Sequence, residues 1–115
     1  FVMYLPPHAF DSGHLPKDWA EKRKKLFGFE PDPEYPTYPF HPEAKYTLIA
    51  KCWVEGGEIV STGFIPCEVT KEGYPVVKDR VGGTAVFDYV SSITAKAGLN
   101  TRFEWYGDEV LIKKD

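Results

Sequence analysis

The chain has 115 residues, enough for one domain with a single hydrophobic core. Hydrophobic residues make up 43% and aromatic residues 16%, which excludes an intrinsically disordered chain. The formal net charge of −3 does not favour a nucleic-acid partner. No apolar run approaches the ~20 residues of a membrane-spanning helix, so we expect no membrane segment in this chain.

The chain opens with FVMYLPP, and its only Met is residue 3. We therefore interpret residues 1–115 either as a single domain or as the C-terminal fragment of a longer protein, with any localisation signal upstream. Residues 1–15 predict the end of a strand and a loop, because Pro6-Pro7 stops the apolar run.

Three side chains of this first loop are candidates for a functional site: His8, Asp11 and His14. Imidazole and carboxylate groups are good ligands for zinc, iron or manganese. Their spacing fixes no ligand geometry in a loop, so we favour a role on the surface or in supporting metal ligands over direct ligation of a metal. We expect no catalytic residue, metal ligand or cofactor in this chain.

A short surface helix is predicted over residues 16–27, with Pro16 at its first position and Gly28 as its C-cap. The basic run at 22–25 complements the helix dipole at this end, and we favour that interpretation over an anion-binding role.

Residues 31–42 carry a proline at every third position: Pro33, Pro36, Pro39 and Pro42. This period predicts a polyproline II strap, which has three residues per turn. Its aromatic side chains, Tyr35, Tyr38 and Phe40, either lie on the domain surface or form a ligand for a partner. We favour the first interpretation, and keep these three with Tyr74 as candidates for an interaction surface.

The strongest structural signal is the stretch 46–69, in which two apolar runs flank Gly56-Gly57. A Gly-Gly pair supplies the positive φ angles of a two-residue primed turn, so we predict a β-hairpin with Glu55 opposite Glu58. Extending this pairing without interruption places Val54 opposite Ile59 and Cys52 opposite Ser61.

Both faces of this predicted hairpin are largely apolar. One face carries Leu48, Ala50, Cys52, Val54, Ile59, Ser61, Gly63 and Ile65, and the other carries Ile49, Trp53, Val60 and Phe64, with Lys51 and Thr62. A hairpin with water on one side alternates apolar and polar residues, so this one is predicted to be covered on both sides. A second copy packed sheet on sheet, giving a homodimer, or residues 1–43 folding back would cover the second face.

The two cysteines, Cys52 and Cys67, are predicted to be free and buried. The uninterrupted register places Cys67 opposite Tyr46, roughly 20 Å along the strand from Cys52 at ~3.3 Å per residue. A disulfide needs Cα atoms within about 4.4–6.8 Å of each other.

The rest of the chain predicts a turn at 71–73, a short extended segment at 74–77 and a long helix over 84–97. Pro75 places the extended segment at an edge of the sheet or outside it. Thr84 is the expected N-cap and Gly98 the expected C-terminal αL residue. A second hairpin turns near Gly107-Asp108. The order ββ(β)αββ over 46–115 predicts an α+β fold, in which the long helix covers one face of an antiparallel sheet.

Catalytic motifs are not found in the sequence. There is no phosphate-binding glycine-rich loop, no paired-cysteine zinc spacing, no His-Glu-x-x-His and no nucleophile elbow. Gly82-Gly83 precedes the helix at Thr84, where backbone N–H groups can bind an anion, but an ordinary loop is the simpler interpretation.

Several segments nevertheless occur together in a familiar order. They are FVMYLPP at 1–7, DPEYPTYP at 32–39, YTLIAKC at 46–52, FIP at 64–66, EGYP at 72–75, DYV at 88–90, GLNTRF at 98–103 and GDEV at 107–110. In these segments the chain resembles the C-terminal region of bacterial poly-γ-glutamate capsule synthesis proteins of the CapA type, within the calcineurin-like metallophosphoesterase superfamily. Tyr74 departs from the resemblance, which implies a polar residue at this position.

The resemblance implies a larger two-sheet sandwich in the parent protein, with a divalent metal bound by residues upstream of this chain. The loop with His8, Asp11 and His14 would follow directly on that metal site, which makes these three residues candidates for its substrate pocket. The resemblance implies a partner too, the N-terminal metallophosphoesterase-like portion of the same protein. The expected function is then a structural part, inert by itself, of a protein that makes poly-γ-glutamate or another cell-envelope polymer, in the bacterial cytoplasm or cell envelope. The alternative is a free-standing module that binds a peptide or polymer through the proline strap.

Overall fold

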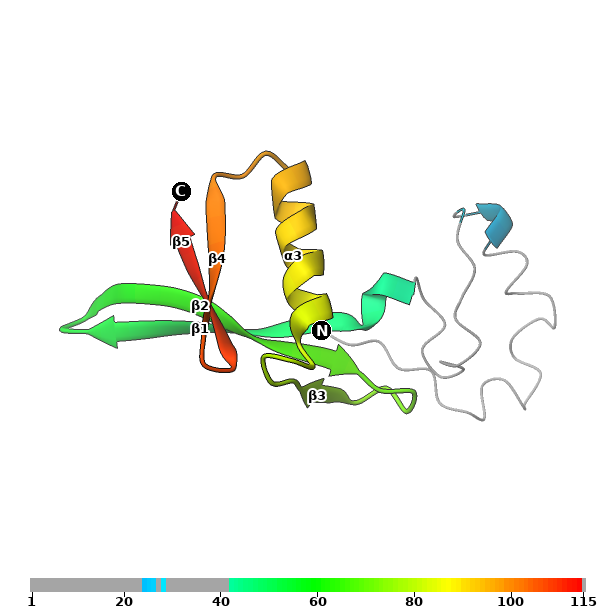
Figure 1. Ribbon diagram of the computed structural model, residues 1–115, viewed down its shortest axis with the longest axis horizontal. Helices are drawn as coiled ribbons and strands as arrows, with labels where there is room; N and C mark the ends of the chain where they lie inside the picture. Colours follow the sequence, from blue (N-terminus) through cyan, green and yellow to red (C-terminus); the bar gives the residue numbers. More distant parts are fainter. Residues whose placement is uncertain (1–23, 27, 29–41, 115) are drawn as a thin grey trace. The chain divides into compact units, whose positions relative to one another are not determined.

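The computed structural model describes residues 24–26, 28 and 42–114 (Figure 1). The chain divides into two compact units, residues 1–45 with 69–75 and residues 46–68 with 76–115, and each is described by itself. The first loop, with His8, Asp11 and His14, lies outside the described residues, as does the strap with Tyr35, Tyr38 and Phe40.

In the first unit, two short segments bear on the predictions. Residues 24–26 are helical, and Gly28 follows with φ of 74° and donates its N–H to the Lys24 carbonyl at 2.9 Å, as expected of a C-cap. Pro42–Lys45 forms the 3₁₀ helix η1, so the prediction that Pro42 ends an extended strap is wrong. A proline φ near −65° suits the first turn of a helix as well as it suits polyproline II.

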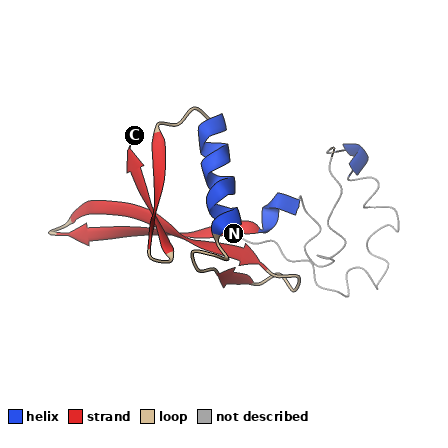
Figure 2. Ribbon diagram, viewed as in Figure 1, coloured by secondary structure: helices blue, strands red, loops and turns tan. Residues whose placement is uncertain are grey.

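The second unit confirms the predicted α+β fold. The sheet contains β1 (Tyr46–Glu55), β2 (Glu58–Val69), β3 (Pro75–Val77), β4 (Thr101–Tyr106) and β5 (Glu109–Lys114), and the long helix is α3 (Thr84–Lys96). The strand order is β1-β2-β5-β4, with β3 beside β2, and the helix lies against β1 and β4 (Figures 1 and 2).

Glycines form the turns of both hairpins, as predicted. Gly56 and Gly57 have φ angles of 58° and 84°, and Gly107 has a φ of 62°. These positive angles match the right-handed twist of the strands that the turns connect, and a residue with a Cβ adopts them only with strain.

The predicted register of the first hairpin is wrong beyond its tip. Glu55 lies opposite Glu58 and Val54 opposite Ile59, as expected, but the register then shifts between Trp53 and Val54. Val60 is the extra residue of this β-bulge, and from there Cys52 faces Thr62 instead of Ser61. The later pairs change in the same way: Ala50 faces Phe64, Leu48 faces Pro66 and Thr47 faces Cys67.

This one-residue shift exchanges the two faces of β2 after the bulge. Phe64 was expected beside Ile49 and Trp53; instead it lies on the helix side of the sheet, where it is 2% exposed. Gly63 moves to the other side. The bulge therefore places the bulkiest apolar side chain of β2 beneath α3, where its burial is worth about 1.5–3 kcal/mol.

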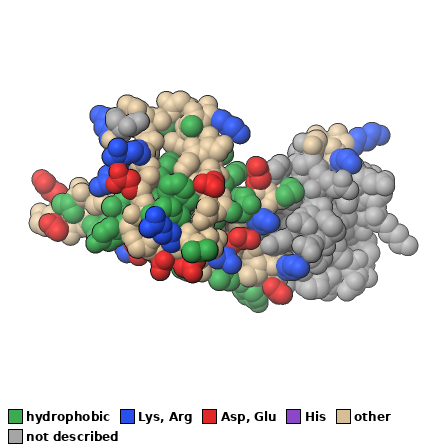
Figure 3. Space-filling view, in the orientation of Figure 1, with side chains coloured by type: hydrophobic (Ala, Val, Ile, Leu, Met, Phe, Trp, Pro, Cys, Tyr) green, Lys and Arg blue, Asp and Glu red, His purple; other side chains and the backbone are tan. Residues whose placement is uncertain are grey.

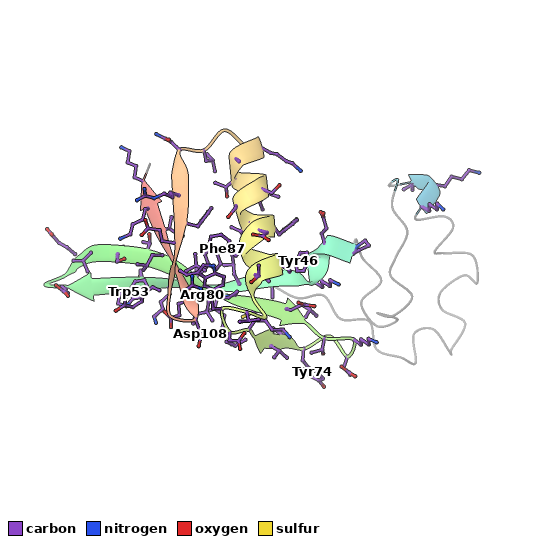
Figure 4. The ribbon with its side chains drawn as sticks, in the orientation of Figure 1. Tyr46, Trp53, Tyr74, Arg80, Phe87 and Asp108 are labelled. Carbon is purple, nitrogen blue, oxygen red and sulfur yellow. The ribbon has the colours of Figure 1, made fainter. Side chains whose placement is uncertain are left out.

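Between helix and sheet lies a cluster of aromatic side chains. Phe87 stacks on Trp105 with ring centroids 5.1 Å apart, and Phe103 meets both Phe87 and Phe64 edge to face. Arg80 covers the far side of the cluster, with its guanidinium 5.9 Å from the centre of the Trp105 ring (Figure 4). Val86 and Val110 are fully buried beside these rings.

The helix ends as predicted but begins differently. Gly98 has a φ of 68° after the C-cap Ala97, whereas Gly83 takes the N-cap position expected for Thr84. The Thr84 hydroxyl donates to the Arg80 carbonyl at 3.0 Å and does not cap the helix. A Cβ at Gly83 would lie 2.7 Å from Pro66, so close packing of the helix start on β2 selects glycine here.

Candidate functional site

The face of the sheet opposite α3 is the best-defined candidate surface of the second unit. Alternation along the strands places these side chains on it: Ile49, Lys51, Trp53, Ile65, Glu109 and Leu111, with Arg102, Glu104 and Tyr106 of β4. We call these residues the open face. Its apolar and charged side chains are mixed, whereas the predicted second face carried Lys51 as its only charged residue.

At the centre of the open face, Lys51 of β1 bridges to Glu109 of β5. The Lys51 ammonium lies 2.8 and 2.7 Å from the two carboxylate oxygens, and both side chains are about one-third exposed. The bond passes across β2 at Gly63, the residue opposite Lys51, because this position has no side chain. This ion pair connects β1, at the edge of the sheet, to β5, an interior strand.

Trp53 covers the same glycine. A Cβ at Gly63 would lie 3.2 Å from the indole ring, and the Lys51 ammonium is 4.9 Å from the ring centre. Figure 4 shows Trp53 and Phe87 on opposite sides of the strands, in agreement with the register. Gly63 thus lets a flat aromatic side chain rest directly on the backbone of β2.

The open face carries groups for packing and recognition, and two ion pairs lie on it; Lys113, opposite Arg102 on the same face, forms none in the described residues. Besides Lys51 and Glu109, Arg102 lies 2.9 Å from the Glu104 carboxylate. Ile49 is 49% exposed and lies opposite Ile65 on the adjacent strand. A partner that covered this face would bury apolar side chains and meet few unpaired charges.

The loop before α3 does not present a free anion site. The Gly82 N–H donates to the Asp79 carboxylate at 2.6 Å, and the Gly83 N–H donates to the Asp79 carbonyl at 2.7 Å. The Arg80 N–H donates to Asp108 in the β4–β5 turn at 3.0 Å. These internal bonds use the backbone donors that Gly82-Gly83 would offer, and they tie the start of the helix to the second hairpin.

The two cysteines differ from each other. Both are free thiols, but only Cys67 is buried, at 2% exposure, whereas Cys52 is exposed on the hairpin. The prediction that Cys52 is buried is wrong: Cys52 lies opposite Thr62, where the pairing of β2 with β5 ends and the hairpin extends beyond the rest of the sheet. Burial raises the pKa of the Cys67 thiol above its ordinary value of 9.0, and a hydrogen bond involving the Ile49 backbone opposes part of this rise.

Of the predicted site residues, only Tyr74 falls among those the structure describes. It lies in a turn, where its carbonyl accepts the Thr70 N–H at 2.8 Å, and its side chain is 68% exposed. His8, Asp11, His14, Tyr35, Tyr38 and Phe40 all lie outside the described residues. The structure brings together instead Lys51, Trp53 and Glu109, which sequence reasoning missed because their contact depends on β5 lying beside β2.

The described residues hold no cluster of potential metal ligands. Within 24–26, 28 and 42–114, no three His, Cys, Asp or Glu side chains gather to hold a metal ion. None of the helices described there is long and apolar enough to cross a membrane. No family model, curated protein or solved structure matches the chain.

Proposed function

We propose that this chain is a structural part of a metallophosphoesterase-like protein for poly-γ-glutamate or cell-envelope polymer synthesis, and that it is inert by itself. The divalent metal and the catalytic ligands would belong to the N-terminal portion of the same protein. The proposal rests on the collinear segments shared with CapA-type proteins, from FVMYLPP to GDEV.

One structural observation carries this proposal: α3 covers one face of the sheet, while the open face keeps apolar side chains in contact with solvent. Ile49 is half exposed at the centre of a strand, a place where packing against a second sheet would bury it. The N-terminal portion of a two-sheet sandwich is the partner that such a face fits.

The first test is the reading frame upstream of Phe1. The resemblance to CapA-type proteins implies Gly-Asn immediately before Phe1. It also implies, further upstream, strands that end in Asp and His residues, and we expect both features. A flexible linker or a signal peptide there would contradict the proposal and favour the free-standing binding module.

The second test compares the longer protein with the 115-residue chain. Ile49→Lys should lower the free energy of unfolding of the longer protein by roughly 2 kcal/mol, because a buried isoleucine is worth about 1.5–3 kcal/mol. The same change in the short chain should have little effect. Val81→Lys, at a loop position 84% exposed, is the matched control and should be neutral in both. Equal effects of Ile49→Lys in the two proteins would show that no second sheet covers this face.

A further inference from the structure

The end of the first hairpin extends beyond the rest of the sheet. Strand β5 pairs with β2 only at Thr62, Gly63 and Phe64, so in the described part of the chain the edge of β2 opposite β1 has no neighbouring strand from Glu58 to Ser61. We call residues 52–61 the arm; Figure 1 shows it reaching past β4 and β5. Its outer edge offers backbone donors and acceptors for pairing with another strand.

Beside the arm, β2 and β5 diverge and enclose a groove of about 260 Å³. Its lining comes from two segments, Ile59–Thr62 on β2 and Ile112–Lys114 on β5. We call this groove the fork. Had the ladder continued past Thr62 and Ile112, Ser61 would pair with Lys113; the divergence leaves space there for a strand from elsewhere.

The arm and the fork carry opposite charges. Glu55 and Glu58 face each other directly at the end of the arm, an arrangement that costs stability because like charges on opposite strands repel. Lys113 and Lys114 line the fork. In the residues that the structure describes, none of these four side chains forms an ion pair. Figure 3 shows acidic side chains at the end of the arm and basic side chains near the free end of β5.

The arm is also apolar on its sides. Val54, Ile59 and Val60 are 57%, 65% and 54% exposed, so three aliphatic side chains within a few residues remain in contact with water. Single exposed aliphatic residues are common on protein surfaces, but a contiguous group on a projecting strand edge is typical of an interaction site.

From these observations we propose that two copies of this chain associate by placing the arm of each in the fork of the other. The free outer edges of the two β2 strands, residues 58–61, would pair antiparallel about a two-fold axis near Ile59. The end of one arm would then lie beside Ser61 of the second copy, where Lys113 and Lys114 line the fork. The carboxylates that repel each other in one chain would each meet lysines of the other.

A second copy is the favoured occupant because both complementary surfaces belong to the same chain. A two-fold interface needs a self-complementary patch, and the adjacent arm and fork form one. The bulge at Val60 and the paired glutamates are devices that prevent indiscriminate edge pairing, so a closed dimer is expected and a fibre is not.

Sedimentation equilibrium of the 115-residue chain tests this proposal with two charge-reversed variants. Glu55→Lys with Glu58→Lys, and separately Lys113→Glu with Lys114→Glu, should each weaken self-association at least about tenfold, because the reversed charges meet like charges across the interface. Mixing the two variants should restore dimers, since every arm then meets a fork of opposite charge. A chain with all four changes should dimerise like the wild type, and circular dichroism checks that each variant is folded.

Three outcomes would overturn the proposal: a wild-type chain that stays monomeric, charge-reversed variants that dimerise as well as the wild type, or a mixture that does not recover. Ile49→Lys is the control for association through the open face, and should leave the dimer intact. The inference goes beyond the proposed function and is tested independently of it. The reading frame upstream of Phe1 tests the proposed function, whereas the charge-reversed variants test the dimer.

Discussion

Gly63 is the residue at which the sheet depends most on the absence of a side chain. An added Cβ would overlap the Val110 carbonyl oxygen on one side and lie 3.2 Å from the Trp53 ring on the other. The Lys51–Glu109 bond also passes over this position. A sequence shows only a glycine within an apolar strand, which weakens the strand unless something packs on it.

We expect Gly63→Ala to lower the free energy of unfolding by roughly 1–3 kcal/mol, because the overlap is with backbone and forces the strands apart. Urea denaturation measures this value. Gly82→Ala is the matched control: the atoms nearest to its new Cβ belong to the Asp79 and Lys78 side chains, at 3.2 Å or more, and we expect less than about 0.5 kcal/mol. Similar losses for the two variants would contradict the packing described at Gly63.

The cysteines allow a second test at this scale. In the folded chain a thiol reagent should modify Cys52 quickly and Cys67 slowly, and after unfolding without reductant it should find two free thiols. Equal rates in the folded chain would show that Cys67 is accessible, and finding no thiol after unfolding would reveal a disulfide.

Burial of Cys67 also predicts a pH dependence of stability. In the unfolded chain this thiol ionises near its ordinary pKa of 9.0, whereas in the folded chain it keeps its proton to higher pH. The unfolded state binds fewer protons in that window, so stability falls as pH rises above 9 toward the folded-state pKa. Cys67→Ala should remove this component of the pH dependence, whereas Cys52→Ala should retain it. Urea denaturation at several pH values between 8 and about 10.5 gives the free energy of unfolding of each variant for this comparison.

At the scale of elements, the first hairpin shows how a single extra residue decides which side chains are buried. Up to Val54 and Ile59 the pairing follows from the turn alone. Beyond them, the bulge at Val60 exchanges the faces, so that Phe64 packs under α3 and Gly63 lies under Trp53. The helix itself depends on this exchange, because Phe64 contacts Phe103 and, through it, the aromatic cluster around Phe87.

A new disulfide distinguishes the observed register from an uninterrupted one. Thr62→Cys should form a bridge with Cys52 under mild oxidation, because directly opposite residues have Cα atoms about 4.5–5.5 Å apart, within the range of a disulfide. Ser61→Cys is the control and should remain reduced, since its side chain points to the other face. Mass spectrometry of the oxidised proteins reads the result. A disulfide in the Ser61→Cys variant alone would show that the hairpin pairs in the uninterrupted register, without a bulge.

At the scale of the whole molecule, the second unit is an antiparallel sheet with one long helix against it. On the open face Lys51 is paired with Glu109, and the backbone donors of Gly82 and Gly83 before α3 are used internally. This arrangement suits a role in holding a larger protein together, which is the role we propose.

We therefore expect this chain by itself neither to bind a transition metal tightly nor to hydrolyse phosphate esters. His8, Asp11 and His14 come from a loop whose sequence spacing fixes no tetrahedral or octahedral geometry. Calorimetric titration with Zn²⁺ and Mn²⁺, together with a phosphatase assay, tests the expectation. Micromolar affinity that disappears in a His8→Ala, His14→Ala variant would instead identify this loop as a metal site.

The sequence by itself determined the turns, the long helix and the α+β class of the second unit. Gly56-Gly57, Gly98 and Gly107 mark positions where only a residue without Cβ adopts a positive φ easily, and that requirement is local. The apolar spacing of residues 84–97 likewise depends on the helix period alone.

Only the tertiary structure decided the bulge at Val60, the cap at Gly83 and the meeting of Lys51 with Glu109. Each depends on groups distant in the sequence: Phe64 reaches the core only if the register shifts, Gly83 is required because Pro66 lies against it, and Lys51 meets Glu109 only because β5 lies beside β2. Local rules could not anticipate them, because burying one large side chain is worth more than keeping a regular ladder of backbone pairs.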